Sequence, residues 1–192
     1  MVRNPARQDQ VLTRIPEEFD ASFQPVIGAP VTLRPLRPED LDIETAFVEG
    51  LSPETRASRL LGGAIRATRE YLERLTRVDY ARDMALAATV MLEGRETLIG
   101  VARYALDADG ESGEFALVIA DAWQGRGIGR KMLEKLVAVA KRRGLRRIYG
   151  DTLSINRPML DLAKALAFEL TRHPGDSSLT RVTLDLRKLG SE

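Results

Sequence analysis

The sequence predicts a mixed α/β fold in a single domain, and three observations support this prediction. The chain has 192 residues, of which 44% are hydrophobic, and this suffices for one compact domain with a sizeable core. Short apolar runs of strand length alternate with stretches of helical periodicity. Three successive strand candidates are joined by short turns, which indicates an antiparallel meander. We therefore expect an α/β fold of the α+β type, in which helices flank a mixed central sheet.

The first half of the chain has one strand followed by helices. Residues 1–28 are polar and interrupted by prolines, so we expect an N-terminal arm with weak structure and place the domain at residues 29–192. Alternating character predicts a strand at 31–37. The helix after it is expected to begin at Pro38, because proline suits a first helical turn. Two further helices are predicted before the meander, at 53–63 and 67–77.

The second half of the chain holds the meander, after which helices alternate with strands. The long helix that follows the meander is expected to end near Arg143, since Gly144 is a natural stop. In chain order we predict strands at 84–92, 97–107 and 114–121, a helix to about residue 143, a strand at 145–153, a helix at 156–168, and two strands within 168–187.

Composition excludes several kinds of chemistry. Basic and acidic residues number 29 and 28, a net charge of +1, so we expect neither a nucleic acid nor a membrane as partner. Cysteine is absent, which excludes disulfides, thiolate metal sites and a cysteine nucleophile. The only histidine, His173, precedes Pro174-Gly175 and is expected in a turn, and we expect no metal. No segment has transmembrane length, and the first 30 residues lack an apolar core of a secretory signal, so we expect a cytoplasmic protein.

The stretch DAWQGRGIGRKMLEKL (121–136) predicts a phosphate-binding turn between a strand and a helix. Glycines allow backbone amides to converge, and the first amides of a helix attract an anion. Arg126 and Arg130 could add positive charge. The Walker motif requires Gly-Lys-Ser/Thr and the dinucleotide motif requires G-x-G-x-x-G, and the stretch matches neither. A tight turn that binds nothing is the alternative.

Gln124–Gly129 resembles the Q/R-x-x-G-x-G/A signature of the GCN5-related N-acetyltransferase (GNAT) family. The resemblance covers about residues 31–186 and implies the GNAT fold, with a mostly antiparallel sheet and with acetyl-CoA as cosubstrate. The segments 33–62, 77–86 and 150–168 also look like the acetyltransferase domains of bacterial protein lysine acetyltransferases. In the family the amides of the turn bind the pyrophosphate of acetyl-CoA, which here implies a role for Gln124, Gly125, Arg126, Gly127, Ile128, Gly129 and Arg130.

Glu114 is our candidate for the general base. A lysine amine with a pKa of about 10.4 is neutral in roughly one molecule in 10³ at pH 7, so a base assists its attack. Glu114 begins the strand before the glycine turn, and the lysine acetyltransferase resemblance also implies a catalytic glutamate in this segment. A solvated carboxylate at the start of a strand is the alternative. Glu111 is the nearest competitor for the role, and Asp79 and Asp83 are weaker ones.

The resemblance concerns three further places in the chain. In the family a bulge on the strand before the turn offers backbone amides to the cosubstrate, and the matching residues here are Leu117, Val118 and Ile119. An asparagine at the start of the later helix often contacts coenzyme A, and Asn156 occupies that place, where a plain helix cap is the alternative. Many members carry a tyrosine in that helix as general acid. The matching position here is Ala163, so that acid is missing.

These residues predict an acetyl-CoA-dependent N-acetyltransferase that acetylates a primary amine by direct attack, with protein lysines as the favoured acceptors. A small-molecule amine acetyltransferase is the first alternative, and a non-catalytic acyl-CoA-binding module is the second. As a partner of the chain we also consider a second copy of it, in a homodimer. Trp123 is expected to serve packing. The basic segment 141–147 is expected to be a solvated helix end, with an acidic partner or the 3′-phosphate of coenzyme A as alternatives.

Overall fold

The computed structural model of the chain describes residues 21–25, 28–59 and 68–190. Eight strands form one sheet in the order β1-β2-β3-β4-β5-β6-β8-β7. All neighbours are antiparallel except β5 and β6, which are parallel. The strands are β1 (Ala21–Phe23), β2 (Val31–Pro35), β3 (Met84–Leu92), β4 (Arg95–Leu106), β5 (Ser112–Ile119), β6 (Arg147–Leu153), β7 (Glu169–Arg172) and β8 (Leu179–Asp185).

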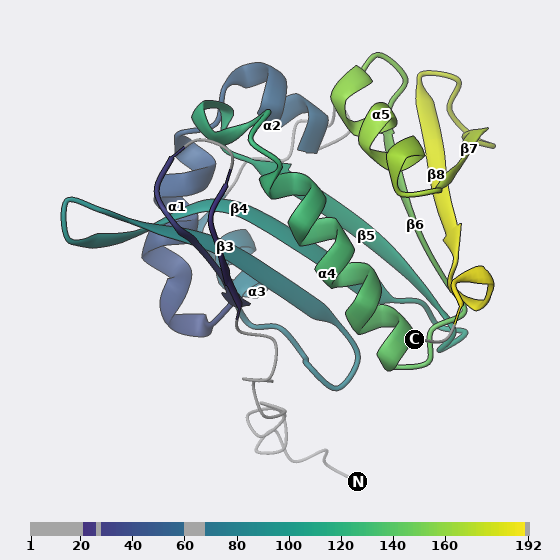
Figure 1. Ribbon diagram of the computed structural model, residues 1–192, viewed down its shortest axis with the longest axis horizontal. Coiled ribbons are helices and arrows are strands. Elements are labelled where there is room, and N and C mark those ends of the chain that lie inside the picture. The colour runs from purple at the N-terminus through teal and green to yellow at the C-terminus, as the bar shows by residue number, and fades with distance from the viewer. Residues whose placement is uncertain (1–20, 26–27, 60–67, 191–192) are drawn as a thin grey trace, which may run out of the picture.

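Five α-helices connect these strands, and they cover the sheet from both sides (Figure 1). The helices are α1 (Leu41–Glu49), α2 (Pro53–Arg59), α3 (Arg69–Thr76), α4 (Ile128–Arg142) and α5 (Arg157–Ala165). The predicted fold class is therefore confirmed. Strand β5 ends two residues earlier than predicted, because a short 3₁₀ turn, Asp121–Trp123, follows it. Helix α5 ends at Ala165, three residues before its predicted end at residue 168.

An edge strand of the sheet lies within the predicted N-terminal arm. Residues 21–23, which we expected in a weakly structured arm, pair antiparallel with β2 and form an edge strand of the sheet. A three-residue strand is too short to show a period in the sequence. Residues 1–20 lie outside the described part of the chain, as do 60–63 at the end of the second predicted helix. The division at residue 29 therefore stays a prediction.

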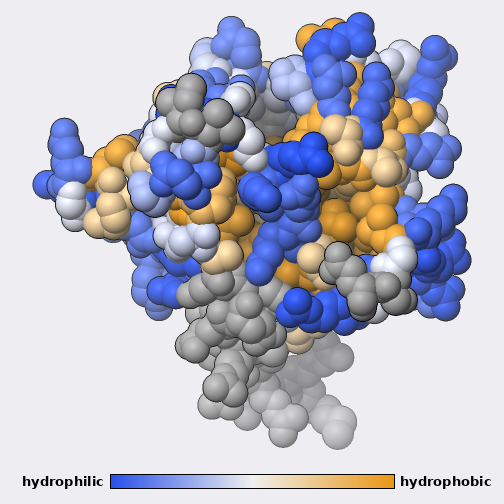
Figure 2. All heavy atoms as spheres, viewed as in Figure 1, coloured by the Kyte–Doolittle hydropathy of each residue, from blue (hydrophilic) through white to orange (hydrophobic). Residues whose placement is uncertain are grey.

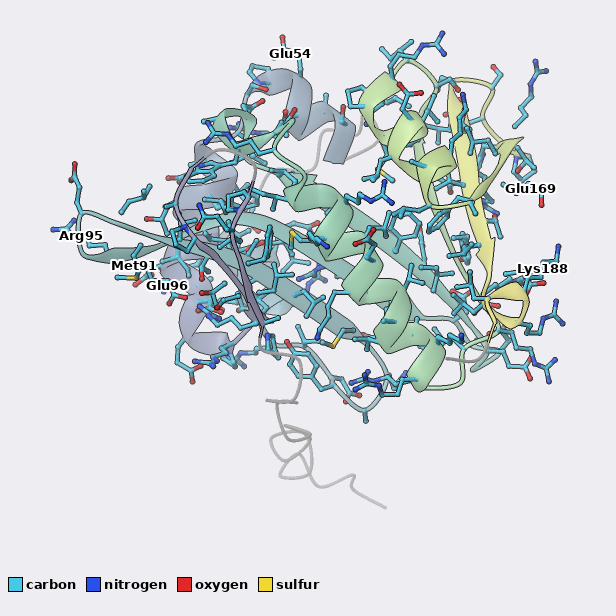
Figure 3. The ribbon with its side chains drawn as sticks, in the orientation of Figure 1. Glu54, Met91, Arg95, Glu96, Glu169 and Lys188 are labelled. Atoms are coloured by element: carbon cyan, nitrogen blue, oxygen red, sulfur yellow. The ribbon has the colours of Figure 1, made fainter. Side chains whose placement is uncertain are left out.

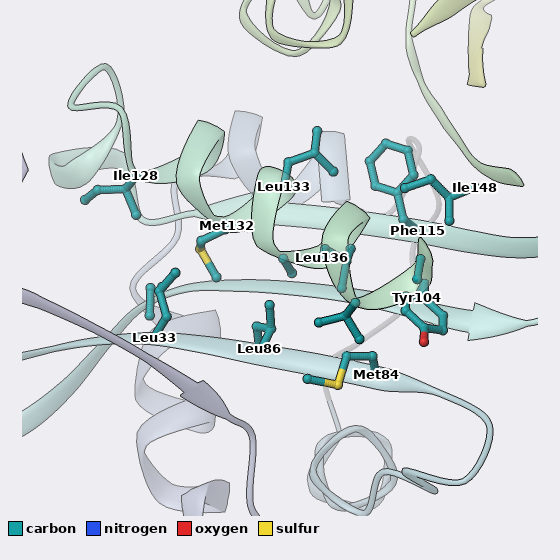
Figure 4. Packing of buried hydrophobic residues seen from close by; sticks show 14 of the residues in the cluster. Leu33, Met84, Leu86, Tyr104, Phe115, Ile128, Met132, Leu133, Leu136 and Ile148 are labelled. Atoms are coloured by element: carbon teal, nitrogen blue, oxygen red, sulfur yellow. The ribbon is translucent and has the colours of Figure 1, made fainter. Parts of the chain in front are cut away.

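One face of the sheet packs against α4. Met132, Leu133 and Leu136 are completely buried there and lie over the central strands (Figure 4). Their spacing places them on one side of the helix. On the opposite face α1 and α3 pack through a second cluster that includes Phe47, Leu72 and several residues of β3 and β4. The central sheet is thus buried on both sides, which explains the uninterrupted apolar run of β3.

The arrangement of β5 and β6 determines where a ligand can enter the sheet. Their parallel pairing covers three residue pairs and stops at Glu114 and Tyr149. Beyond this point β5 continues to Ile119 along β4, while β6 diverges toward β8 (Figure 1). At the divergence, Gly150 approaches Phe115 so closely that a Cβ atom there would lie 2.8 Å from the Phe115 carbonyl oxygen. A side chain at this position would push the strands apart.

On the face shown in Figure 2, hydrophilic residues lie along the rim, and hydrophobic residues are visible beside α4, toward α5 and β6. The β3–β4 hairpin projects beyond the other strands and carries Met91, Arg95 and Glu96 near its end (Figure 3). Met91 is 61% exposed, so this hairpin contributes no core at its tip.

Candidate active site

A cleft of about 670 Å³ opens where β5 and β6 diverge, and side chains from both faces of the sheet line it. We call the two parts of this cleft the loop side and the α2–α3 side. The loop side is lined by residues of the glycine turn and of α5: Gln124, Gly125, Gly127, Gly129, Arg130, Asn156, Pro158, Met159 and Leu162. The α2–α3 side is lined by Glu54, Thr55, Ser58, Tyr71, Leu75, Val101, Arg103, Glu114, Ala116 and Asp151.

The glycine turn presents open backbone to the loop side. Gly125 and Gly127 have φ angles of +72° and +81°, a region that favours glycine, and Gly127 caps α4. No heavy atom lies within 4 Å of where a Cβ would stand at either position. The turn therefore combines room for close approach with the unpaired first amides of a 15-residue helix, which suits a phosphate group.

The remaining residues of the turn have different roles. Ile128 is 1% exposed and belongs to the core, so its side chain does not reach the cleft. Arg126 lies over the Trp123 ring, with its guanidinium carbon 4.8 Å from the ring centroid. Arg130 lines the cleft and pairs with Glu134 at 2.8 Å. Of the two arginines expected to add charge, Arg130 is the one that lines the cleft.

The side chain of Gln124 connects the turn to the rest of the protein. Its Nε2 donates to the Ile119 carbonyl at 3.0 Å and contacts Thr55 Oγ1 at 3.2 Å. The amide group is therefore engaged with β5 and α2. A phosphate at this residue would meet its backbone rather than its side-chain nitrogen.

The end of β5 offers backbone amides without the bulge that we expected. Every residue of β5 is described, and its register with β4 runs unshifted from Gly113 to Ile119. Ala120 N donates to the Ile99 carbonyl of β4. Because successive residues direct their backbone groups to opposite edges of a strand, the N–H groups of Leu117 and Ile119 face away from β4 and that of Val118 faces toward it. Divergence of β6, not a bulge, uncovers the outward-facing amides.

Asn156 is a helix cap that also lines the cleft. Its Oδ1 accepts a hydrogen bond from Met159 N at 3.3 Å, and its Nδ2 donates to Thr152 Oγ1 at 3.1 Å. Asn156 therefore caps the helix, and its contact with coenzyme A stays a prediction. Ala163 on α5, where many family members have a tyrosine, is fully buried in the core. Alanine carries no hydroxyl group, so this position offers no general acid.

Glu114 lies in the cleft at the last parallel pair of β5 and β6. Desolvation raises the pKa of its carboxyl above the usual value, and the negative charges of Asp151 and Asp107 raise it further, while Arg181 opposes them. A carboxylate with a raised pKa is a better proton acceptor, because its basicity approaches that needed near neutral pH.

The competing carboxylates are occupied outside the cleft. Glu111 pairs with Arg146 at 2.9 Å. Asp83 accepts a hydrogen bond from Leu106 N at 3.0 Å, and Asp79 accepts one from Ala81 N at 3.1 Å. None of the three lines the cleft, so Glu114 is the best placed of the four candidates.

A charged cluster beside Glu114 was missed by sequence reasoning. Asp151 on β6 accepts two hydrogen bonds from Arg181 on β8, at 2.9 and 2.8 Å, and His173 Nε2 lies 3.4 Å from it. The Arg181 guanidinium also lies over the Tyr149 ring, at 4.8 Å. Alternation along β6 could have placed Tyr149 and Asp151 on one face. Their common partner, Arg181, lies on a strand some 30 residues further along the chain, and no local sequence pattern reveals that pairing.

Several side chains of the basic segment 141–147 are bound to other parts of the protein. Arg143 donates to the Asp83 carbonyl at 2.9 Å and contacts the Tyr104 hydroxyl, and Arg147 donates to Ser112 Oγ at 2.8 Å. With Arg146 bound to Glu111, these cations serve the structure at the end of α4. Helix α4 ends at Arg142, within this segment, which agrees with the expected helix end, and Arg143, Arg146 and Arg147 each have a partner within the protein.

Comparisons with known proteins agree with this geometry. Residues 56–168 match the model of the acetyltransferase (GNAT) family. The chain is 39% identical over 151 residues to Acetyltransferase PA5475 of Pseudomonas aeruginosa, an alignment that covers 79% of this chain and 81% of that protein. The chain belongs to the GNAT acetyltransferase family.

Solved structures show the same GNAT fold. The GNAT domain of S. lividans PAT superimposes with a TM-score of 0.79 at 26% identity, over 90% of this chain and 99% of that one. A ribosomal L7/L12 alpha-N-protein acetyltransferase in complex with coenzyme A has a TM-score of 0.66 at 13% identity, over 84% and 98% of the two chains, which shows the fold alone.

GNAT acetyltransferases use acetyl-CoA and act on amine acceptors, and this chain is an acetyltransferase of that family. The open turn at Gly125 and Gly127 and the outward amides of β5 fit the cosubstrate, because they provide donors and space together. Within the described residues no three His, Cys, Asp or Glu side chains form a group that could hold a metal ion. In the same part of the chain, no helix has the length and apolar character needed to cross a membrane.

Proposed function

We propose that this GNAT acetyltransferase acetylates a primary amine, with protein lysine side chains as the favoured acceptors and Glu114 as the general base. The observation that carries the proposal is the position of Glu114: it lies in the cleft, on the strand that presents the free amides, and its pKa is raised. The cosubstrate supplies an acetyl thioester. We assign its binding to the loop side and the acceptor to the α2–α3 side.

The roles of the residues follow from this assignment. Glu114 accepts a proton from the ammonium group of the acceptor, and the lone pair of the resulting neutral amine attacks the carbonyl carbon of the thioester to form the new C–N bond. The C–S bond then breaks, coenzyme A leaves as the thiolate, and the nitrogen loses its second proton to solvent. The amides of Leu117 and Ile119, which face away from β4, are placed to donate to the carbonyl oxygen as it gains negative charge. With alanine at position 163, the departing thiolate takes its proton from water.

The α2–α3 side supports a long cationic acceptor. Its floor includes the small or apolar side chains Ala116, Val101 and Leu75, along which an aliphatic stem could lie. Carboxylates at Glu54 and Glu114 provide negative charge for an ammonium group. The segments that resemble bacterial protein lysine acetyltransferases contribute Glu54, Thr55 and Asp151 to this surface, which favours a protein lysine over a small amine.

Thiol release from acetyl-CoA tests the proposal when it is followed with a lysine-containing peptide, free lysine and spermidine as acceptors. Turnover that is fastest with the peptide supports the protein assignment, and faster turnover with spermidine or free lysine supports the small-amine alternative. Saturable binding of acetyl-CoA without turnover on any acceptor indicates a non-catalytic acyl-CoA-binding module, for which the missing tyrosine at Ala163 is the supporting observation.

A further inference from the structure

Asp121 connects two elements that are far apart in the sequence. It lies two residues after the end of β5, at the start of the 3₁₀ turn. Its carboxylate accepts hydrogen bonds from Ser52 N at 2.9 Å, from Ser52 Oγ at 2.7 Å and from Thr55 Oγ1 at 2.6 Å. These bonds lower the pKa of Asp121 to about 2, so the group is ionised at neutral pH. One charged group thus binds the first turn of α2 in three places.

The same contact reaches the glycine turn. Thr55 Oγ1, which donates to Asp121, also lies 3.2 Å from Gln124 Nε2, and that nitrogen donates to the Ile119 carbonyl. The end of β5, the glycine turn and α2 are therefore joined by one hydrogen-bond network. It connects the loop side of the cleft to the α2–α3 side.

Helix α2 depends on polar contacts for its position. It has seven residues, and none of the six whose side chains are described, 53–58, is buried. A helix of this length is not stable alone and needs tertiary contacts. Besides Asp121, the structure shows Arg56 Nη2 bound to the carbonyls of Glu49 and Leu51, both at 3.1 Å. Removing the Asp121 contact therefore frees the end of α2 that carries Glu54 and Thr55.

Those residues form a wall of the cleft. Glu54, Thr55 and Ser58 line the α2–α3 side, which Glu114 also lines (Figure 3 shows Glu54 on α2). We propose that Asp121 is a positioning residue that holds α2 as the wall of the acceptor site and ties that wall to the glycine turn. The proposal rests on the proposed function only in assigning the acceptor to this side. The hydrogen bonds themselves and the position of α2 do not depend on it.

Asp121→Ala tests the proposal, with Asp176→Ala as the matched control. Asp176 also caps a turn, accepting from Ser178 N at 2.8 Å and Ser178 Oγ at 2.6 Å, but it lies between β7 and β8 and outside the cleft. Hydrogen exchange is measured at the amides of residues 54–59 in the full chain. We expect at least tenfold faster exchange there in Asp121→Ala, with exchange in β4 and α4 unchanged, and no change in α2 for Asp176→Ala. Unchanged exchange at 54–59 overturns the proposal.

Kinetics separate positioning from a general structural role. With the peptide acceptor we expect Asp121→Ala to raise the acceptor KM at least fivefold, while kcat and the Kd for acetyl-CoA stay within about twofold. Ser52→Ala, which loses one donor to Asp121, should reproduce part of the KM change, and Ser52→Thr, which keeps the hydroxyl, should restore it. If the Kd for acetyl-CoA rises by the same factor as the acceptor KM, the proposal is overturned. If the unmodified protein releases no thiol with any acceptor, the proposed function fails, and the exchange measurement still decides the role of Asp121.

Discussion

The two sides of the cleft are built from the chain in opposite ways. More than half of the residues that line the loop side come from one continuous stretch, because the glycine turn and the start of α4 follow each other between residues 124 and 130. The α2–α3 side is assembled from residues as distant as Glu54, Arg103 and Asp151, which lie on a helix and two different strands.

This difference separates what the backbone does from what side chains do. The loop side needs open amides and glycine conformations, which a short local sequence specifies. The α2–α3 side needs charges at defined places, and these depend on which strands are neighbours and on how a short helix is held. Changes on the two sides should therefore produce separable effects, on cosubstrate affinity and on turnover or acceptor binding.

The largest effect is expected from Glu114→Gln. The amide cannot accept the proton, so we expect kcat to fall about 100-fold or more, since general base catalysis contributes about 10²–10⁴-fold. The Kd for acetyl-CoA should change less than twofold. Steady-state thiol release and calorimetric titration measure the two quantities. Glu111→Gln is the control, because that residue is three positions earlier and pairs with Arg146 outside the cleft. Equal kcat in the two variants would remove Glu114 as base.

The junction between the two sides is tested by Gly150→Ala. The new Cβ would stand 2.8 Å from the Phe115 carbonyl, a backbone atom that cannot move alone, so we expect a loss of about 1–3 kcal/mol in the free energy of unfolding. Gly113→Ala is milder, because its Cβ would meet the side chains of Leu145 and Tyr104 at 3.1 and 3.3 Å. Denaturant unfolding compares them, and equal losses would show that the approach of β6 to β5 is not tight.

The loop side is tested by comparing Gly127→Ala with Gly144→Ala. Both glycines have φ +81° and open space around a Cβ, so both substitutions should cost about 1 kcal/mol of stability. Gly127→Ala alone should also raise the Kd for acetyl-CoA, by about tenfold, or about 1.4 kcal/mol, because its methyl group occupies space in the turn. Thermal unfolding and calorimetric titration measure both effects. A similar Kd for the two variants contradicts the assignment of the turn to the cosubstrate.

The smallest effect is expected in the pH dependence of Asp151→Asn. The negative charge of Asp151 raises the pKa of Glu114, so removing it should lower that pKa. Arg181, freed from Asp151, acts in the same direction, because its positive charge also lowers the pKa of Glu114. The acidic limb of kcat/KM, where the base becomes protonated, should therefore move to lower pH. Asp185→Asn, on β8 and paired with Arg187, is the control and should leave the limb in place. Movement to higher pH contradicts the assignment.

Sequence reasoning succeeded where information is local. Glycine spacing and the strand before it identified the turn, and Gly144 located the end of α4 to within one residue. The same reasoning treated every residue of the turn alike. The structure separates them, because Ile128 packs in the core while Gly127 faces open space. A motif names a segment, and the direction of each side chain depends on the neighbouring elements.

Sequence reasoning failed where pairing is non-local. The edge strand β1 is three residues long, and the Asp151–Arg181 pair requires that β6 and β8 be neighbours. The bulge expected near Leu117 came from the family resemblance. The register with β4 is regular, and the outward-facing amides are uncovered because pairing with β6 ends at Glu114. Asp121 looked like the end of a strand, and its contact with Ser52 spans 69 residues.

The early end of the β5–β6 pairing has a kinetic consequence. The cleft is lined from both faces of the sheet. If the donor and the acceptor occupy its two sides as proposed, each ligand enters and leaves from a different face. Neither product then blocks the exit of the other. The order of loading and unloading is set by the concentrations and affinities of the two ligands and not by the shape of the site, so coenzyme A should compete with acetyl-CoA, and the acetylated acceptor with the amine.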